Sequence, residues 1–248
     1  MTANGYAFEN TIGITVGNAH IYGTLIIPSE AWSAVIFAHG SGSSRHNPRY
    51  LAVAQTLHRV GLATLLVDLL TPTEERVDQL TARYRFDMEL LTNRLLSSTD
   101  WLLSNFSQYE FRIGYFGAGT GAGAMFKAAA RRPDIAAIVS RGGRPDLAED
   151  ELADVQAATL LLVGGLDLPH MNTNQIAYRQ LERAHRREIQ VVPGATHLFE
   201  EKGALEQVSL LSTQWFVRYL DAAAGQSEDQ KPILRSRQSE LSTLFEKN

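Results

Sequence analysis

The hydrophobic residues of this chain fall in short runs, and these runs are separated by longer segments in which apolar residues recur at helical spacing. Short apolar or alternating runs are typical of strands, and they predict eight of them, at 7–15, 19–27, 33–38, 62–67, 112–116, 135–140, 159–164 and 188–192. The helical spacing predicts helices at 48–60, 87–106, 118–131, 176–185 and 204–224. The turn formers Gly17 and Asn18 indicate that the first two strands form a hairpin.

This alternation of strands and helices predicts an α/β fold, in which helices cover both faces of a central, mostly parallel eight-stranded sheet. The polar segment 71–86 predicts an excursion over the surface. Residues 1–225 are expected to form one domain. Residues 226–248 are rich in Gln, Ser, Asp, Lys and Arg, and they predict a flexible tail with one short helix at 239–245.

Composition narrows the classes of protein that fit. The 248 residues suit one large α/β domain with a sizeable core. The net charge of −4 without a basic run argues against nucleic acid as a partner, and the lack of cysteine excludes disulfides and a thiol nucleophile. No apolar run approaches the roughly 18 residues that a membrane span needs, and no leader pattern opens the chain. We therefore expect a cytoplasmic protein that does not contact membranes.

Residues 112–125, RIGYFGAGTGAGAM, are the most informative segment, because an apolar strand turns there directly into a helix of small residues. This is the frame of a nucleophile elbow, G-x-S-x-G, in which a serine at the turn performs acyl transfer. Gly117 and Gly121 occupy the outer positions, but Gly119 stands where the serine belongs. Thr120 is not expected to replace it, since an elbow aims only its central residue at the base.

An acid and a base follow two later strands. Asp167 comes just after the strand at 159–164, and His197 lies in the glycine-containing loop after the strand at 188–192. A loop histidine can act as general base when an acid orients it. The order elbow, acid, histidine is that of α/β-hydrolases. Taken singly, a helix cap at Asp167 and a surface role for His197 explain each residue as well.

The loop after the strand at 33–38 reads His39-Gly40-Ser41-Gly42. The backbone N–H groups of Ser41 and Thr120 are the predicted oxyanion hole. His39 and Gly40 are expected to line the substrate site with Arg45 and His170. A second set of cations near strand ends either binds an anionic substrate group or forms ion pairs with acids such as Asp68: His46, Arg49, Arg141 and Arg144.

With these motifs in order, the chain resembles the α/β-hydrolase superfamily, and in particular its dienelactone-hydrolase-like branch. The resemblance spans roughly residues 10–222 and is carried by FAHGSGSSRHNPRY (37–50), LLVDLLTPTEERVD (65–78), IGYFGAGTGAGA (113–124), VSRGGRPDLA (139–148), LLVGGLDLPH (161–170) and VVPGATHLFEE (191–201). It implies the α/β-hydrolase fold and hydrolysis of a small carboxylic ester or lactone, with Asp167 as acid and His197 as base. The nucleophile position falls on Gly119, where this chain departs from the family.

Three accounts of Gly119 fit the sequence. A serine was deliberately replaced to trap a ligand, or the chain is a natural pseudo-hydrolase, or His197 and Asp167 activate water directly. A rival from another class is an NADP-binding oxidoreductase, because Gly117, Gly119 and Ala122 also fit the dinucleotide fingerprint. A purely structural protein would fill the elbow pocket with side chains. We expect no cofactor and no metal, and a homodimer is left open.

Overall fold

The computed structural model describes residues 5–40 and 42–221 of the chain. The predicted tail at 226–248, its helix at 239–245 and the oxyanion-loop residue Ser41 lie outside these residues. None of the helices in the described part is both long and apolar enough to cross a membrane.

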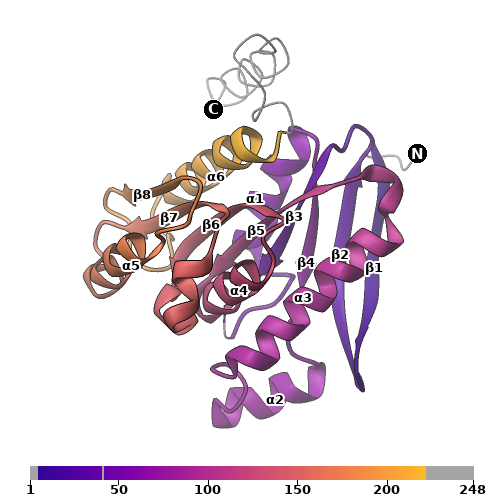
Figure 1. The fold of residues 1–248 in the computed structure, drawn as a ribbon, viewed down its shortest axis with the longest axis horizontal. Helices are drawn as coiled ribbons and strands as arrows, with labels where there is room; N and C mark the ends of the chain where they lie inside the picture. Colours follow the sequence, from indigo (N-terminus) through magenta and orange to yellow (C-terminus); the bar gives the residue numbers. More distant parts are fainter. Residues whose placement is uncertain (1–4, 41, 222–248) are drawn as a thin grey trace.

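A single sheet of eight strands runs through the described residues, in the order β1-β2-β4-β3-β5-β6-β7-β8 (Figure 1). The pairs β1·β2 and β2·β4 are antiparallel, and all later neighbours are parallel. This confirms the predicted fold class. The strand bounds are Tyr6–Val16 (β1), Ala19–Pro28 (β2), Ser33–Ala38 (β3), Leu62–Val67 (β4), Arg112–Ala118 (β5), Ile135–Gly143 (β6), Ala158–Gly164 (β7) and Arg187–Val192 (β8).

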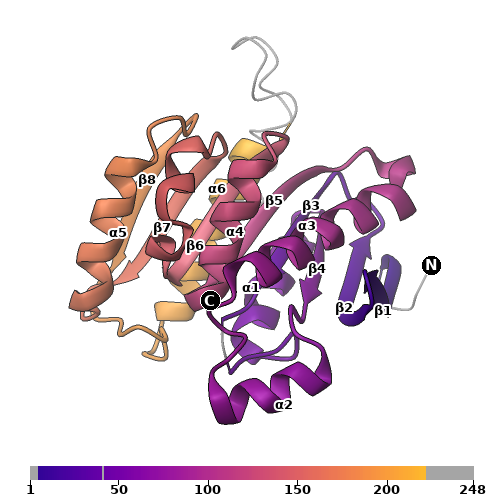
Figure 2. The same cartoon turned by 60° about the horizontal axis from the view of Figure 1, so that its bottom comes forward.

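Helices cover both faces of the sheet, because strands such as β3 and β4 are buried along their whole length and need apolar partners on each side. One hydrophobic cluster packs α1 (Pro48–Arg59) and α6 (Ala204–Leu220) against one face. A second cluster packs α3 (Met88–Asn105), α4 (Gly119–Arg131) and α5 (Leu168–Gln180) against the other. Figure 2 shows these two helical layers with the sheet between them.

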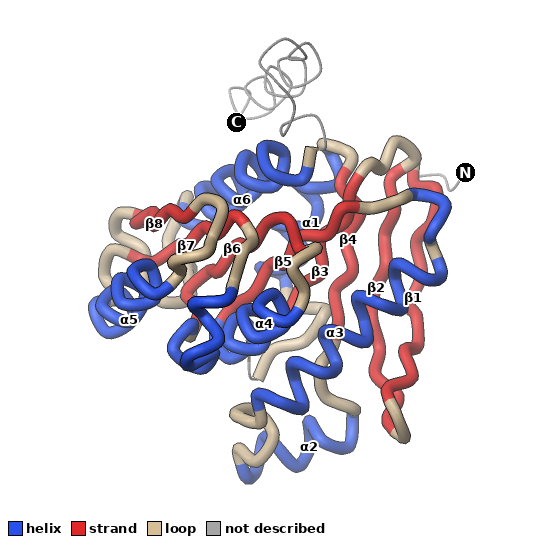
Figure 3. Tube along the Cα trace, viewed as in Figure 1, coloured by secondary structure: helices blue, strands red, loops and turns tan. Residues whose placement is uncertain are grey.

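Two helical segments differ from the prediction. The segment 71–86 contains a helix, α2 (Pro72–Thr81), which lies away from the sheet near the start of α3 and begins with a capping box between Thr71 and Glu74 (Figure 3). The helix expected at 176–185 instead begins directly after Asp167, and Pro169 sits in its first turn. Only Asn174 and Ala177 of α5 are buried, so its sequence lacks the apolar spacing that marks a helix.

The parallel register brings the functional loops to one edge of the sheet. Ala38 pairs with Gly117 across β3 and β5, Ala118 pairs with Arg141 across β5 and β6, and Gly164 pairs with Val192 across β7 and β8. The carboxyl ends of these strands are therefore level. Ligands of open α/β sheets bind at that edge.

The loop after β3 packs directly on the first turn of α4. A Cβ on Gly121 would lie 2.4 Å from the carbonyl oxygens of both Ala38 and His39. We expect Gly121→Ala to lower the free energy of unfolding by about 1–3 kcal/mol, because two backbone segments must move apart. Urea denaturation measures this. Gly13→Ala is the matched control, since nothing lies within 4 Å of its Cβ position; equal losses in both variants would contradict the account.

Candidate active site

The turn between β5 and α4 has the geometry of a nucleophile elbow. Gly119 has a φ of +52°, in the left-handed region that glycine adopts without strain. A Cβ built on Gly119 would meet only the Cα of Gly40 within 4 Å, at an ordinary contact distance of 3.5 Å. The position therefore has space for a side chain but carries none.

His197 and Asp167 meet at the carboxyl ends of β8 and β7. Nδ1 of His197 lies 2.8 Å from Oδ2 of Asp167. The loop of His197 can pack this closely because Gly164 has no side chain: a Cβ there would lie 2.4 Å from the carbonyl oxygen of Ala195. The hydrogen bond fixes the ring of His197 so that its Nε2 is the nitrogen left for a reacting group.

A second histidine binds the same carboxylate. Nδ1 of His170, in the first turn of α5, lies 2.7 Å from Oδ1 of Asp167. The two imidazole rings stack with centroids 4.3 Å apart and an interplanar angle of 25°. Asp167 thus holds two parallel imidazoles, one on each carboxylate oxygen.

The Asp167 side chain is 5% exposed. Burial by itself raises the pKa of its carboxyl, but the hydrogen bonds from His170 and His197 and their charge outweigh burial and lower the pKa below the ordinary value of 3.8. The carboxylate therefore stays ionised at neutral pH, where it can stabilise a proton on either ring.

These groups open onto a cavity of about 290 Å³. Of the residues singled out in the sequence, it brings together Gly40, Arg49, Gly119, Thr120, Arg141, Arg144, His170 and His197. The other described residues of its lining are Gly42, Ser43, Asn47, Tyr50, Phe86, Ala118, Gly142 and Leu198. Thr120 follows Gly119 in the first turn of α4, where a helix N-terminus favours negative charge.

Asp68, at the end of β4, binds the loop that follows β3. It accepts a hydrogen bond of 2.7 Å from the backbone N–H of Arg45, pairs with the Arg45 guanidinium, and lies 3.2 Å from Nε2 of His39. Neither His39 nor Arg45 is among the residues that line the cavity. We therefore propose that these two residues hold the loop rather than bind substrate.

Arg141 is the most unusual residue of the cavity. It is 6% exposed, and its guanidinium lies over the rings of Tyr50 and Phe199, at 5.4 and 5.7 Å from their centroids. Its Nε and Nη1 have no hydrogen-bond partner among the described residues. Burial, with the nearby charge of Arg49 adding to it, lowers the pKa of this guanidinium from its usual value, and the Tyr50 hydroxyl partly offsets that. A buried cation in this setting favours an anionic ligand.

The sequence did not single out Tyr50, Phe86 or Leu198, which also line the cavity. Tyr50 lies on α1, and its hydroxyl accepts a hydrogen bond of 3.2 Å from the backbone N–H of Gly40. Phe86 lies in the segment after α2. No local pattern marks these residues, because α1 and the segment after α2 reach the cavity only through the tertiary fold. The YL pair at Tyr50-Leu51 looks like any core position of a helix.

In the described residues, Asp167, His170 and His197 also form a group whose ligand atoms lie within 4.8 Å of one another. The two imidazole rings stack at an interplanar angle of 25°. Both Nδ1 atoms are already bound to the carboxylate. We propose that the group serves proton transfer, because the carboxylate already holds both imidazoles.

The lowered pKa of Asp167 links the site to stability. An acid whose pKa is depressed by folding stabilises the fold above its ordinary pKa, and this contribution is lost as the pH falls through the folded value. We expect Asp167→Asn to lower the free energy of unfolding by about 2 kcal/mol at neutral pH. Urea denaturation between about pH 6 and pH 3 should show the gap to wild type closing. A gap that is independent of pH would contradict the assigned cause.

Comparison with known proteins shows the family of the chain. A family model described as "PETase: PET hydrolase-like" matches residues 33–230. Two Mycobacterium tuberculosis proteins, each named "Putative phosphoribosyl transferase", are 48% identical to this chain over 213 residues. That match covers 86% of this chain and 47% of each relative, so the chain spans about half the length of the curated relatives it matches.

Solved structures agree with the family model. A dienelactone hydrolase from Anabaena variabilis is 50% identical, with a TM-score of 0.82, and the match covers 86% of this chain and 99% of that one. Est1E from Butyrivibrio proteoclasticus shares the fold, with a TM-score of 0.69 at 16% identity over 84% of this chain and 98% of that one. The chain belongs to the α/β-hydrolase superfamily, in its dienelactone-hydrolase-like branch.

Proposed function

We propose that this chain hydrolyses a small carboxylic ester or lactone, in the cytoplasm, with a water molecule in place of the serine nucleophile. One observation carries the proposal: His197, held by Asp167, opens onto the same cavity as Gly119, whose missing side chain leaves space at the elbow. A water in that space lies where the hydroxyl of a serine would be. Polar groups line the cavity, which suits an ordered water.

In the proposed reaction, Nε2 of His197 takes a proton from this water as the water oxygen attacks the substrate carbonyl. Asp167 stabilises the imidazolium that forms. The negative charge that develops on the carbonyl oxygen is stabilised at the N-terminus of α4, next to Thr120. No acyl-enzyme forms, so hydrolysis proceeds in one attack and one collapse of a tetrahedral intermediate.

Arg141 supports a narrower substrate class, an ester or lactone that carries a carboxylate. Arg141 lines the same cavity as Gly119, and its backbone pairs with Ala118 across β5 and β6. Its buried Nε and Nη1 have no hydrogen-bond partner among the described residues, so each is a donor that an anionic group could use. The other cavity cations have acidic partners, since Arg49 pairs with Glu200 and Arg144 with Asp146.

The other candidate functions have weaker support. The transferase name belongs to proteins about twice as long as the segment matched here, so we propose no phosphoribosyl transfer for this chain. We do not propose NADP binding, because the chain belongs to a hydrolase family in which the glycines at this turn form the nucleophile elbow. Titration with NADPH stays its direct test.

The proposal is tested with p-nitrophenyl acetate and three forms of the chain. Wild type should hydrolyse the ester, and His197→Ala should reduce kcat/KM by at least about 100-fold. Gly119→Ser should add labelling by a fluorophosphonate, with a small loss of stability because serine is strained at positive φ. An inactive wild type beside an active Gly119→Ser form would overturn water activation and favour a pseudo-hydrolase or a replaced serine.

The role of Arg141 is tested with Arg141→Met, which keeps the bulk and removes the charge. For a carboxylate-bearing lactone, KM should rise about 10- to 100-fold, because a charge-assisted hydrogen bond is lost. For a neutral ester of similar size, KM should stay the same, and the variant should unfold at no lower temperature than wild type. An equal rise in KM for both substrates would show that Arg141 supports the cavity without selecting an anion.

A further inference from the structure

The second histidine on Asp167 is not needed to orient His197. A triad carboxylate performs that task with one hydrogen bond, and here its other oxygen is taken by His170 at 2.7 Å. His170 lines the cavity with His197 and Gly119. Since Nδ1 of each ring is bound to the carboxylate, each ring has its Nε2 left to meet a ligand.

A reaction without an acyl-enzyme needs its proton transfers at different times from those of a serine hydrolase. In the serine mechanism one histidine acts as base and then as acid, in steps separated by a covalent intermediate. When water attacks directly, the same tetrahedral intermediate that has just received the water oxygen must also release the alcohol. A base for the water and an acid for the leaving oxygen are then both required within one encounter.

The charges around the two rings favour a pair that carries one proton. The carboxylate of Asp167 balances one imidazolium, and two stacked imidazoliums 4.3 Å apart would repel each other. The other charged or titratable side chains that line the cavity are Arg49, Tyr50, Arg141 and Arg144. The acids nearby are bound elsewhere, because Glu200 and Asp146 pair with the arginines and Glu201 binds Thr196. No carboxylate is present in the described lining to stabilise a second proton.

We propose that His170 is the general acid of this site and works beside His197 as the general base. The inference rests on the proposed function and goes beyond it by assigning a second catalytic histidine. His197 Nε2 takes a proton from water as the new C–O bond forms. His170 Nε2 then gives its proton to the alkoxide oxygen as the ester C–O bond breaks. The products are a carboxylic acid and an alcohol, and the pair still carries one proton, which solvent returns to His170.

A leaving-group comparison separates this role from a structural one. An alkyl ester needs a proton on its departing oxygen, whereas p-nitrophenolate leaves without one. In His170→Gln, the glutamine amide can still donate to Asp167, so His197 stays oriented. We expect kcat/KM to fall about 100-fold for an ethyl ester and by less than about threefold for the p-nitrophenyl ester of the same acid. His197→Ala should lower both rates.

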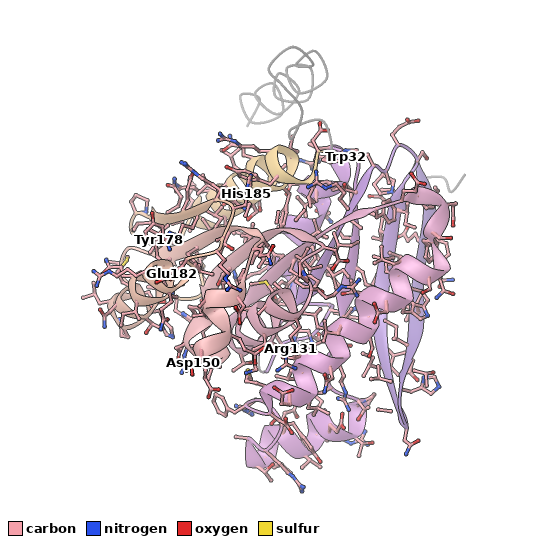
Figure 4. The ribbon with its side chains drawn as sticks, in the orientation of Figure 1. Trp32, Arg131, Asp150, Tyr178, Glu182 and His185 are labelled. Atoms are coloured by element: carbon pink, nitrogen blue, oxygen red, sulfur yellow. The ribbon has the colours of Figure 1, made fainter. Side chains whose placement is uncertain are left out.

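The matched control is His185→Gln. His185, labelled in Figure 4, is exposed and directly precedes β8. It therefore lies at the amino end of that strand, whereas the site lies at the carboxyl ends. This variant should leave both rates unchanged. Equal losses for the two esters in His170→Gln would show that His170 only supports the ring of His197, and would overturn the inference while the proposed function stands. A wild type that hydrolyses neither ester would instead overturn the proposed function.

The wild type supplies a second measurement that does not depend on how well a variant folds. The pH profile of kcat/KM for the ethyl ester should be bell-shaped, because the reaction then needs both a base and an acid. The profile for the p-nitrophenyl ester should rise to a plateau, because only the base is needed. Profiles of the same shape for both esters would contradict a general acid.

Discussion

The site depends on the close approach of backbone segments at the carboxyl edge of the sheet. Gly121 admits the carbonyls of Ala38 and His39, and Gly164 admits those of Ala195 and Thr196, at distances that any Cβ would forbid. These contacts bring the loop after β3 to the turn between β5 and α4, and the loop of His197 to Asp167. The parallel register places the strand ends at the same level. Because Gly121 and Gly164 have no side chain, the loops can then pack closer than a Cβ would allow. The cavity exists because backbone packs on backbone there.

Two buried charged residues, Asp167 and Arg141, determine which chemistry the cavity can support. Asp167 is the buried anion of the site, and it is shared by two imidazoles instead of one. Arg141 is a buried cation held between aromatic rings, with donors that no described residue uses. Asp167 places a negative charge next to the two histidines, and Arg141 places a positive charge in the lining of the same cavity. In the proposed reaction the histidines transfer the protons and Arg141 binds the anionic group of the substrate.

Most strands of the sheet and several residues of the site could be predicted from the sequence. The residues that were not predicted were missed for physical reasons. Strands such as β3 and β7 were predictable because buried parallel strands are continuous apolar runs, and Asp167 follows one of them. His197 follows β8, an edge strand that is only partly buried, so its signal was the glycine-containing loop itself. The bond between His170 and Asp167 was not, because α5 has few buried residues and its helical start left no periodic signal. The burial of Arg141 could not be predicted either. The local sequence around an arginine at a strand end does not show whether the side chain is solvated or lies over the rings of Tyr50 and Phe199. Tyr50 and Phe86 reach the cavity only through tertiary packing.

In the proposed mechanism hydrolysis at this site needs no covalent intermediate, because water takes the place of a serine at Gly119. The most direct measurement is the intact mass of the wild-type chain, quenched in acid during steady turnover of an ester. We expect the unmodified mass while the carboxylic acid product accumulates. An acyl adduct on the chain during turnover would contradict it, since a side chain would then be acting as nucleophile.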